Sequence, residues 1–328
     1  MPDLYNEVSM NTGRKFKIAA FGEVLWDLLP DASVLGGAPF NFTYRINSLD
    51  NEGVMISAVG KDFLGEKALK AISALQISDR YIQINPEYPT GTVNVFFDEF
   101  KNPDYEIIKG VAYDFVTFNE KLERLISQVD CICFGTLAQR NSVSKQTLQN
   151  LLQHFKGKYR LYDLNLRKEC YSIENIISSL KTTDILKLNE QEANKLNNLL
   201  QLNKKGLVEI CTELINSYRL QYCVITLEER GSLAVSVRGE VVYTPGFKVN
   251  LTDPLGAGDA FSAAFVNSLL RGKSLREAGE SGNQLGALVA TKKGATQKIA
   301  QDELNNIALE NNRIFDQNFS NYINLFYL

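Results

Sequence analysis

The chain of 328 residues has little histidine and cysteine, the residues that most metal centres and nucleophilic triads need. Its one histidine, His154, lies in a polar, helix-like stretch and is expected on the surface. That placement removes His-dependent triads and most zinc sites from consideration. The cysteines show no metal-ligand spacing and lie mostly in apolar segments, so we expect reduced core thiols in a cytosolic protein. They are Cys131, Cys133, Cys170, Cys211 and Cys223.

Long apolar runs and an excess of basic residues are also missing. The net charge of -3 and a pI near 5.5 argue against nucleic acid as a partner, because proteins that bind it usually carry a basic footprint. No apolar run approaches the length that crosses a bilayer, and Met1 to Lys17 form a polar segment without a signal-peptide core. We therefore expect a cytoplasmic protein with no membrane partner. Hydrophobic residues make up 45% of the chain, so it can bury a large core.

Short apolar runs alternate with amphipathic stretches along most of the chain. This alternation predicts an α/β domain in which helices cover both faces of a parallel sheet. The expected strands are Phe16 to Leu25, Val54 to Val59, Cys131 to Phe134, Arg160 to Leu164, Ile185 to Leu188 and Tyr222 to Leu227. The expected helices include Leu64 to Leu75, Val143 to Phe155, Ile173 to Leu180, Leu207 to Tyr218, Gly258 to Leu270 and Leu275 to Lys292.

One region, from about Tyr81 to Lys109, breaks this alternation. It contains strand-like pieces with no helix between them, at Tyr81 to Ile84, Thr92 to Phe97 and Tyr105 to Ile108. With Leu28 to Leu35 they predict a small antiparallel sheet, formed by residues of about 28–36 and 81–110. One face of such a sheet has no helical cover, so it must close over a ligand or pair with another copy.

The segment from Asp253 to Phe261 is the most informative part of the chain. The glycine turn Gly256-Ala257-Gly258 leads into an apolar run that predicts a buried helix. Unpaired N–H groups and the helix dipole at such a helix start favour an anion such as phosphate. Asp259 would oppose that anion with its own charge, which suggests a base beside a transferring phosphate. A dinucleotide-binding turn would need glycine where Phe261 stands; a plain helix-capping turn stays open as the alternative.

A second glycine pair, Gly36-Gly37, precedes Ala38-Pro39-Phe40-Asn41. Glycines allow a ligand to approach the backbone closely, and Pro39 suits the first turn of a helix. Asn41 could turn its amide toward the same space. A simple glycine turn is the alternative interpretation.

Polar residues follow the ends of several expected strands, where parallel sheets bind their ligands. The first strand is expected to end near Asp27. For Asn189 the alternative to a ligand-binding role is a helix cap, which Asn favours. The residues at these ends are Asp27, Gly135, Thr136, Asp163, Asn165, Arg167, Asn189, Glu190, Gln191, Glu192 and Thr226.

These residues resemble those of the ribokinase-like (PfkB-type) carbohydrate kinases over nearly all of the chain. Two signatures carry the resemblance: Gly36 to Asn41 followed by Val59 to Gly65, and Asp253 to Phe261. Asn189 with Glu192 resembles the family's Asn-x-x-Glu motif. The sugar signature with Asp163, Asn165 and Arg167 is most similar to the fructokinase branch. Ketodeoxygluconate kinases are similar, but they tend to have Glu where Pro39 stands and Tyr where Leu166 stands.

The resemblance implies one ribokinase-like kinase domain over residues 1–328, with three α/β/α layers, a mostly parallel central sheet and the small sheet as a lid. It implies an ATP-dependent kinase that phosphorylates a primary hydroxyl of a sugar, with fructose converted to fructose 6-phosphate. Alternatives are 2-keto-3-deoxygluconate or another sugar as substrate, or a non-catalytic sugar- or nucleotide-binding regulator. Family habit also suggests a homodimer through the lid.

The resemblance also implies roles for individual residues. Asp259 would be the base, while the N–H groups of Gly256, Ala257 and Gly258 hold the transferring phosphoryl group. Glu192, with Asn189, would organise Mg²⁺ through water, and the Asp253 and Leu255 loop would bind a monovalent cation such as K⁺. The sugar-binding residues would be Asp27, Gly36, Gly37, Asn41 and Arg167. The nucleotide-binding residues would be Asn189, Thr226, Gly231, Gly256, Gly258 and Asn283.

Several positions depart from the family pattern. Pro254 replaces the usual threonine after Asp253, and Glu228 replaces the glycine usual after Thr226-Leu227. Residues 312–328 are rich in aromatics and could form a helix that packs on the domain or on a partner; the sequence leaves both open.

Overall fold

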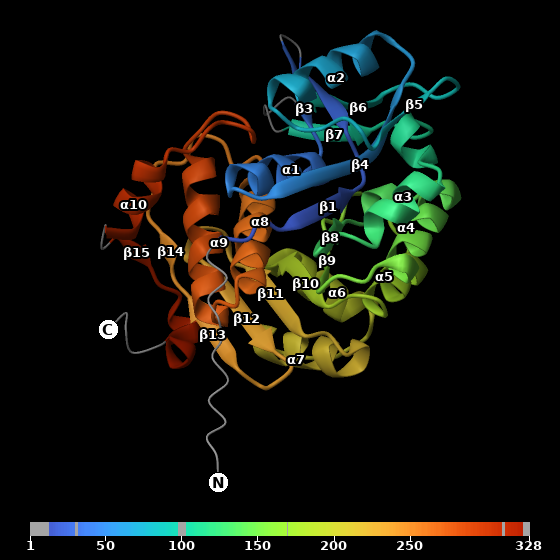
Figure 1. The fold of residues 1–328 in the computed structure, drawn as a ribbon. Helices are drawn as coiled ribbons and strands as arrows, with labels where there is room; N and C mark the ends of the chain where they lie inside the picture. The colour runs from blue at the N-terminus through green and yellow to red at the C-terminus, as the bar shows by residue number, and fades with distance from the viewer. Residues whose placement is uncertain (1–12, 30–31, 98–102, 169, 310–311, 324–328) are drawn as a thin grey trace.

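A nine-stranded sheet forms the centre of the computed structural model, which describes residues 13–29, 32–97, 103–168, 170–309 and 312–323. Its strand order is β13-β12-β11-β10-β9-β8-β1-β4-β5, and Figure 1 shows helices packed against it. The strands from β11 to β5 all pair in parallel, whereas β12 and β13 form an antiparallel edge. Their bounds are β1 Lys17–Phe21, β4 Glu52–Gly60, β5 Ile82–Asn85, β8 Cys131–Phe134, β9 Tyr159–Asp163, β10 Ile185–Asn189, β11 Tyr222–Thr226, β12 Ser232–Ser236 and β13 Val241–Thr244.

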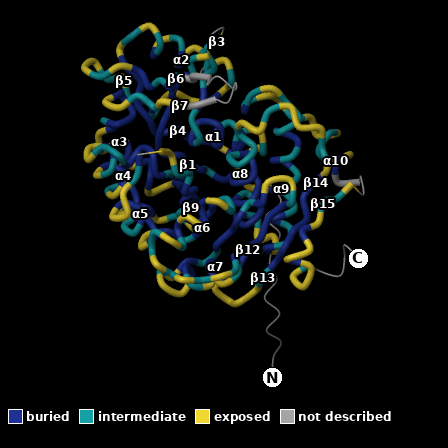
Figure 2. Tube along the Cα trace, turned by 180° about the vertical axis from the view of Figure 1, so that it is seen from behind, coloured by how far each residue is buried: buried dark blue, intermediate teal, exposed yellow. Residues whose placement is uncertain are grey.

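Helices cover both faces of this sheet, which confirms the predicted three-layer ribokinase-like α/β/α fold. Successive residues of one strand pack on opposite faces of the sheet: on β8, Phe134 packs in one core cluster and Cys133 in the other. One core includes side chains of α3 Glu120–Ile126, α4 Ser142–His154, α5 Ile173–Leu180, α6 Glu190–Leu199 and α7 Leu207–Tyr218. The other includes side chains of α1 Ala38–Ser48, α2 Phe63–Ala74, α8 Ala257–Leu270 and α9 Leu275–Ala290. Figure 2 shows the central strands as the buried part of the trace.

The small sheet is mixed rather than antiparallel, which corrects the prediction. Its order is β3-β2-β6-β7, and β2 pairs with β6 in parallel. The segment predicted as a small-sheet strand at Tyr81 to Ile84 instead contributes β5 to the main sheet, where it pairs with β4. The sequence pattern could not reveal this, because a short strand does not specify its partner. The bounds are β2 Leu25–Leu29, β3 Ala32–Gly36, β6 Gly91–Phe97 and β7 Pro103–Ile107.

The expected first strand, Phe16 to Leu25, is two strands. The chain leaves the main sheet after Phe21 and begins β2 at Leu25. Gly22 permits this change because its φ is 148°, and a Cβ there would lie 2.7 Å from the Cγ of Pro39. Asp27 therefore lies on the small sheet, not at the end of the first main-sheet strand.

Residues 312–323 of the aromatic C-terminal segment pack on the domain itself, and the rest of that segment lies outside the described residues. Residues Gln317–Tyr322 form a 3₁₀ helix, and the ring of Phe319 lies 5.4 Å from that of Tyr243 on β13. Before it, β15 Arg313–Ile314 pairs with β14 Gly246–Phe247, and α10 spans Gln301–Leu309. Among the described residues, no helix is long and apolar enough to cross a membrane.

Candidate active site

The predicted phosphate-binding turn lies at the start of α8. Gly256 adopts a left-handed conformation with φ 78° and precedes a helix start that has no side-chain cap. A Cβ on Gly256 would lie 2.4 Å from that of Ala295, so the turn requires glycine. The N–H of Ala257 donates to the carbonyl oxygen of Pro254 at 3.2 Å. The next N–H groups, beginning with Gly258, belong to a first helical turn that cannot pair them within the helix, so they suit an anion.

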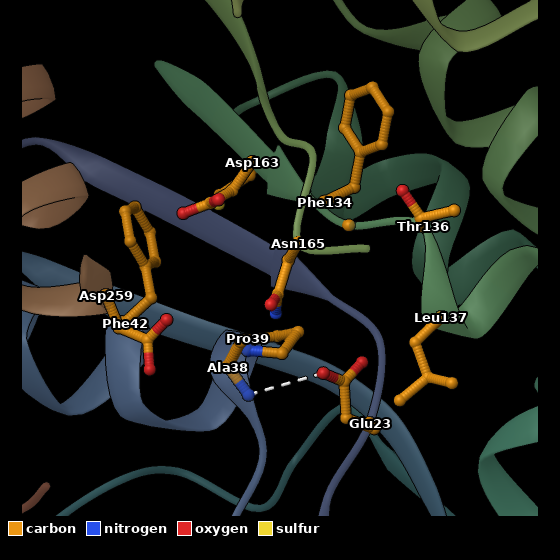
Figure 3. A pocket seen from close by; sticks show the side chains of 12 residues that line it. Glu23, Ala38, Pro39, Phe42, Phe134, Thr136, Leu137, Asp163, Asn165 and Asp259 are labelled. Carbon is orange, nitrogen blue, oxygen red and sulfur yellow. Dashed lines mark hydrogen bonds between the residues drawn. The ribbon is translucent and has the colours of Figure 1, made fainter. Parts of the chain in front are cut away.

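Asp259 lies in a cavity at the carboxyl ends of β1, β8 and β9 (Figure 3). Its Oδ2 accepts a hydrogen bond of 2.9 Å from Nδ2 of Asn41. Water reaches part of Asp259 from the cavity, but protein surrounds the carboxyl group, and this burial raises its pKa to about 6. The charge of Asp163 adds to the rise, while the Asn41 hydrogen bond opposes it. A carboxylate with a pKa near the operating pH suits a general base.

Glu23 lines the same cavity and was not recognised from the sequence. Its side chain is buried, and its Oε1 accepts a hydrogen bond of 3.3 Å from the Ala38 N–H, drawn in Figure 3. Burial raises the pKa of Glu23 to about 7, against the favourable charge of Arg167. The available signal was a charged residue inside an otherwise apolar run.

Lys187 is a second buried charge that sequence reasoning missed, although it interrupts the apolar strand β10. Its Nζ lies 3.2 Å from Oδ1 of Asp163, whose Oδ2 accepts a hydrogen bond of 2.8 Å from Ser262. A Cβ on Gly258 would lie 3.1 Å from this Nζ, so the ammonium group adjoins the phosphate-binding turn. Burial lowers the pKa of Lys187, but the charges of Asp163, Glu192 and Asp259 outweigh it and raise the pKa overall. Lys187 is therefore a cation at this turn.

Of the predicted sugar-side residues, Gly37 and Asn41 adjoin Glu23 and Asp259, two residues that line the cavity. Asp27 on β2 is half-buried, and burial raises its pKa while Arg167 opposes the rise. A Cβ on Gly36 would lie 3.1 Å from Oδ2 of Asp27, and Gly37 adopts a φ of 113° that favours glycine. Arg167 is exposed, and its charge acts on Glu23, Asp27 and Asp259 alike. Asn41 turns its amide toward Asp259.

Asn189 and Glu192 form a capping box at the start of α6, so the capping alternative for Asn189 is realised. Asn189 Oδ1 accepts from the Glu192 N–H at 2.8 Å, and Glu192 Oε2 accepts from the Asn189 N–H at 2.9 Å. The other carboxyl oxygen of Glu192 accepts from the Leu166 N–H at 2.7 Å. Burial raises the pKa of Glu192 although Lys187 opposes the rise. The described residues contain no group of three or more His, Cys, Asp or Glu side chains that could hold a metal.

Three predicted nucleotide-side residues lie around the edge strands β11 to β13. Thr226 ends β11. Gly231 has a φ of 98°, and a Cβ on this residue would lie 2.1 Å from the Thr244 carbonyl oxygen, so the position requires glycine. Asn283 on α9 donates to that same oxygen at 2.9 Å. Glu228, where the family usually has glycine, adopts a left-handed φ of 56°. The unusual residue therefore keeps a backbone conformation that favours glycine.

The predicted monovalent-cation loop joins two distant segments. Asp253 Oδ2 accepts from the Gly294 N–H at 2.9 Å, and its Oδ1 accepts from the Leu255 N–H at 3.0 Å. The carboxylate thus ties the segment before the phosphate-binding turn to the loop after α9. Cation binding by the Asp253 and Leu255 carbonyls stays a prediction.

The fold and this edge of the sheet define a class of protein: a ribokinase-like α/β protein with a glycine turn at a helix start, followed directly by the partly buried carboxyl group of Asp259. Residues 32–302 match the pfkB family carbohydrate kinases, so the chain belongs to that family. The fructokinase of Escherichia coli is 25% identical over 297 residues, which cover 85% of this chain and 94% of that protein.

Solved structures agree with this assignment. The sugar kinase PH1459 of Pyrococcus horikoshii, solved in complex with ATP, is 27% identical, with a TM-score of 0.75 over 88% of this chain and 99% of that chain. The fructokinase of Vibrio cholerae O395, solved with fructose, ADP and calcium, is 23% identical, with a TM-score of 0.75 over 89% of this chain and 99% of that chain. The second likeness supports the fold alone.

Proposed function

We propose that this carbohydrate kinase transfers the γ-phosphate of ATP to a primary hydroxyl of a sugar, with fructose as acceptor and fructose 6-phosphate as product. One observation carries the proposal: the enclosed carboxylate of Asp259 follows directly on a glycine turn suited to a phosphoryl group. Asp259 accepts the hydroxyl proton as the sugar oxygen bonds to the γ-phosphorus. The bond from that phosphorus to the bridging oxygen of ADP breaks in the same transfer.

The phosphate-binding turn and Lys187 stabilise the charge on the group in transfer. The N–H groups of Gly256, Ala257 and Gly258 are the proposed donors, with Gly258 the best placed because Ala257 already donates to Pro254. The Lys187 ammonium adds a positive charge beside Gly258. Phosphoryl transfer depends mainly on positioning and electrostatics, so this small set of groups can suffice.

The sugar is proposed to lie between the cavity and the small sheet. Asp27, Gly36, Gly37, Asn41 and Arg167 are the proposed binding residues, and the small sheet acts as a lid that excludes water. Support comes from the hydrogen bond of Asn41 to Asp259 and from Arg167, whose charge acts on both Asp27 and Asp259.

The nucleotide is proposed to extend from the phosphate-binding turn toward Asn189, Thr226, Gly231 and Asn283. Mg²⁺, which shields the phosphate charge when bound, would meet Glu192 through water. Both Glu192 oxygens accept one backbone N–H each and retain further lone pairs, so contact through water fits this residue.

The carbonyl oxygens of Asp253 and Leu255 are the proposed ligands of a monovalent cation such as K⁺. Carbonyl oxygen is the donor that such ions take, and Pro254 between these residues keeps its own carbonyl.

The acceptor is tested by ADP release from ATP with Mg²⁺ and, in parallel, fructose, ketodeoxygluconate, ribose and adenosine. Fructose is expected to give the highest kcat/KM. Preference for ketodeoxygluconate would reassign the substrate within the class. Absence of turnover with every sugar would favour a sugar- or nucleotide-binding regulator, for which a base beside the phosphate has no use.

A homodimer through the lid is proposed on the exposure of Leu29 on β2 and Tyr105 on β7. Apolar side chains on an uncovered sheet face favour pairing with a second copy. Sedimentation at micromolar concentration tests it, and a monomer there would contradict it.

A further inference from the structure

Arg45 on α1 is a buried cation without a carboxylate partner. Its side chain has an exposed fraction of 0%, and it forms no ion pair with a carboxylate in the described part of the chain. Its guanidinium carbon lies 5.0 Å from the centre of the Tyr44 ring. Two of its nitrogens donate to backbone carbonyl oxygens, Nη1 to Gln297 at 2.8 Å and Nη2 to Ala295 at 2.5 Å. Its Nε is buried with no hydrogen-bond partner. Burying a charge with so few partners is costly, so we examine which part of the site the Arg45 side chain stabilises.

The segment that Arg45 holds lies directly behind the phosphate-binding turn. Ala295 occupies the space next to Gly256, since a Cβ on that glycine would lie 2.4 Å from the Ala295 methyl carbon. The neighbouring Gly294 N–H is bound by Asp253 at 2.9 Å. Arg45 binds the carbonyl oxygens of Ala295 and Gln297, and Asp253 binds the N–H of Gly294. The segment that these two residues bind supports the backbone of the turn.

The same helix also reaches the proposed base. Asn41 lies four residues before Arg45, so both side chains project from one face of α1. Asn41 donates to Asp259, and α1 begins directly after Gly37 of the sugar signature. Burial lowers the pKa of Arg45 to about 10, while the neighbouring Tyr44 and the negative charge of Asp259 oppose the fall. One rigid helix thus contacts the sugar signature, the base and the support of the turn.

We infer that Arg45 is a positioning residue for the phosphate-binding turn: it fixes residues 294–297 against Gly256, so that binding of the terminal phosphate depends on α1. This inference rests on the proposed kinase function, in which the turn holds the γ-phosphoryl group. Arg45 itself touches neither sugar nor nucleotide. Its effect is transmitted by Ala295. The guanidinium binds the Ala295 carbonyl oxygen and so keeps the Ala295 methyl group next to Gly256.

The test compares the affinities of a non-hydrolysable ATP analogue and of ADP for wild type, Arg45→Met and Arg45→Lys. Arg45→Met should weaken the analogue by about tenfold, since about 1.4 kcal/mol of lost positioning corresponds to that factor, and should weaken ADP clearly less. Arg45→Lys keeps the charge and a donor and should fall between. Arg160→Met is the matched control, because Arg160 pairs with Asp184 and is not part of the site; it should bind both nucleotides as wild type does.

A merely structural role of Arg45 would lower the unfolding temperature and leave both affinities of the folded protein unchanged, or reduce them equally. Either result would overturn the inference. Ala295→Gly provides a second route if Arg45→Met does not fold, because it removes only the methyl group that meets Gly256. It should change the analogue affinity in the same direction, and wild-type affinity in this variant would also contradict the inference. The binding measurement contains no sugar, so failure of sugar phosphorylation would leave this test independent.

Discussion

Replacing Asp259 by asparagine should remove catalysis while making the protein more stable at alkaline pH. Burial raises the pKa of Asp259 from 3.8 to about 6, so the folded state resists ionisation of this group. The cost of ionising it is fully present above the folded pKa and disappears below the unfolded one. A shift of this size corresponds to at most about 3 kcal/mol at about pH 8, and water in the cavity reduces that figure.

Asp259→Asn keeps the shape of the side chain and an oxygen that can accept from Asn41. The gain in stability should therefore be at most about 3 kcal/mol at about pH 8 and at most about 1 kcal/mol at about pH 4.5, where the folded wild type holds the proton. For a chain of 328 residues this gain corresponds to a rise in unfolding temperature of about 4 °C. Turnover should fall by about 10²–10⁴-fold, the usual contribution of a general base.

The assay combines thermal unfolding at both pH values with ADP release under saturating ATP. Asp79→Asn is the control, because Asp79 is exposed and lies outside the site. A loss of stability of Asp259→Asn at alkaline pH, or turnover at the wild-type rate, would contradict these roles of Asp259. Loss of activity together with loss of ATP-analogue binding would indicate a collapsed site instead of a missing base.

Three further perturbations follow from the buried polar groups of the site. Asn41→Leu removes a hydrogen bond that lowers the pKa of Asp259, so the acidic limb of the pH–rate profile should move to higher pH; an unmoved limb would count against this pairing. Lys187→Met should lower kcat by about 10²-fold, as the loss of one electrostatic donor does, and should change the KM for the sugar little. A near-normal kcat would show that Lys187 does not stabilise the charge of the transferring group. Glu23→Gln should raise the unfolding temperature more at about pH 8.5 than at about pH 5.5, because burial raises the pKa of Glu23 to about 7; equal effects at both pH values would contradict that cause.

Local signals in the sequence predicted much of the fold. The helices at Ile173–Leu180 and Leu207–Tyr218 have the predicted bounds, because apolar periodicity decides them. The turn at Gly256 was predictable because two glycines precede an apolar helix. The partner of β5 was not, since pairing in a sheet is settled by tertiary contacts that a strand of four residues does not encode.

The charged residues inside apolar runs show where sequence reasoning stopped. Glu23 and Lys187 both stand in segments whose apolar pattern predicts buried core strands. In the structure each is buried, and each contacts a neighbour from a distant part of the chain, Ala38 and Asp163. A buried charge within a strand was the signal, but its partner depends on the fold.

In the proposed reaction, Asp259 deprotonates a sugar hydroxyl beside a phosphate held by the Gly256 to Gly258 turn. The most direct measurement is mass-spectrometric detection of fructose phosphate formed from fructose, ATP and Mg²⁺ by wild type and by Asp259→Asn. We expect stoichiometric fructose 6-phosphate and ADP with wild type and almost none with the variant, at equal affinity for the ATP analogue. Equal product from both proteins, or none from wild type with any sugar, would contradict the proposed reaction.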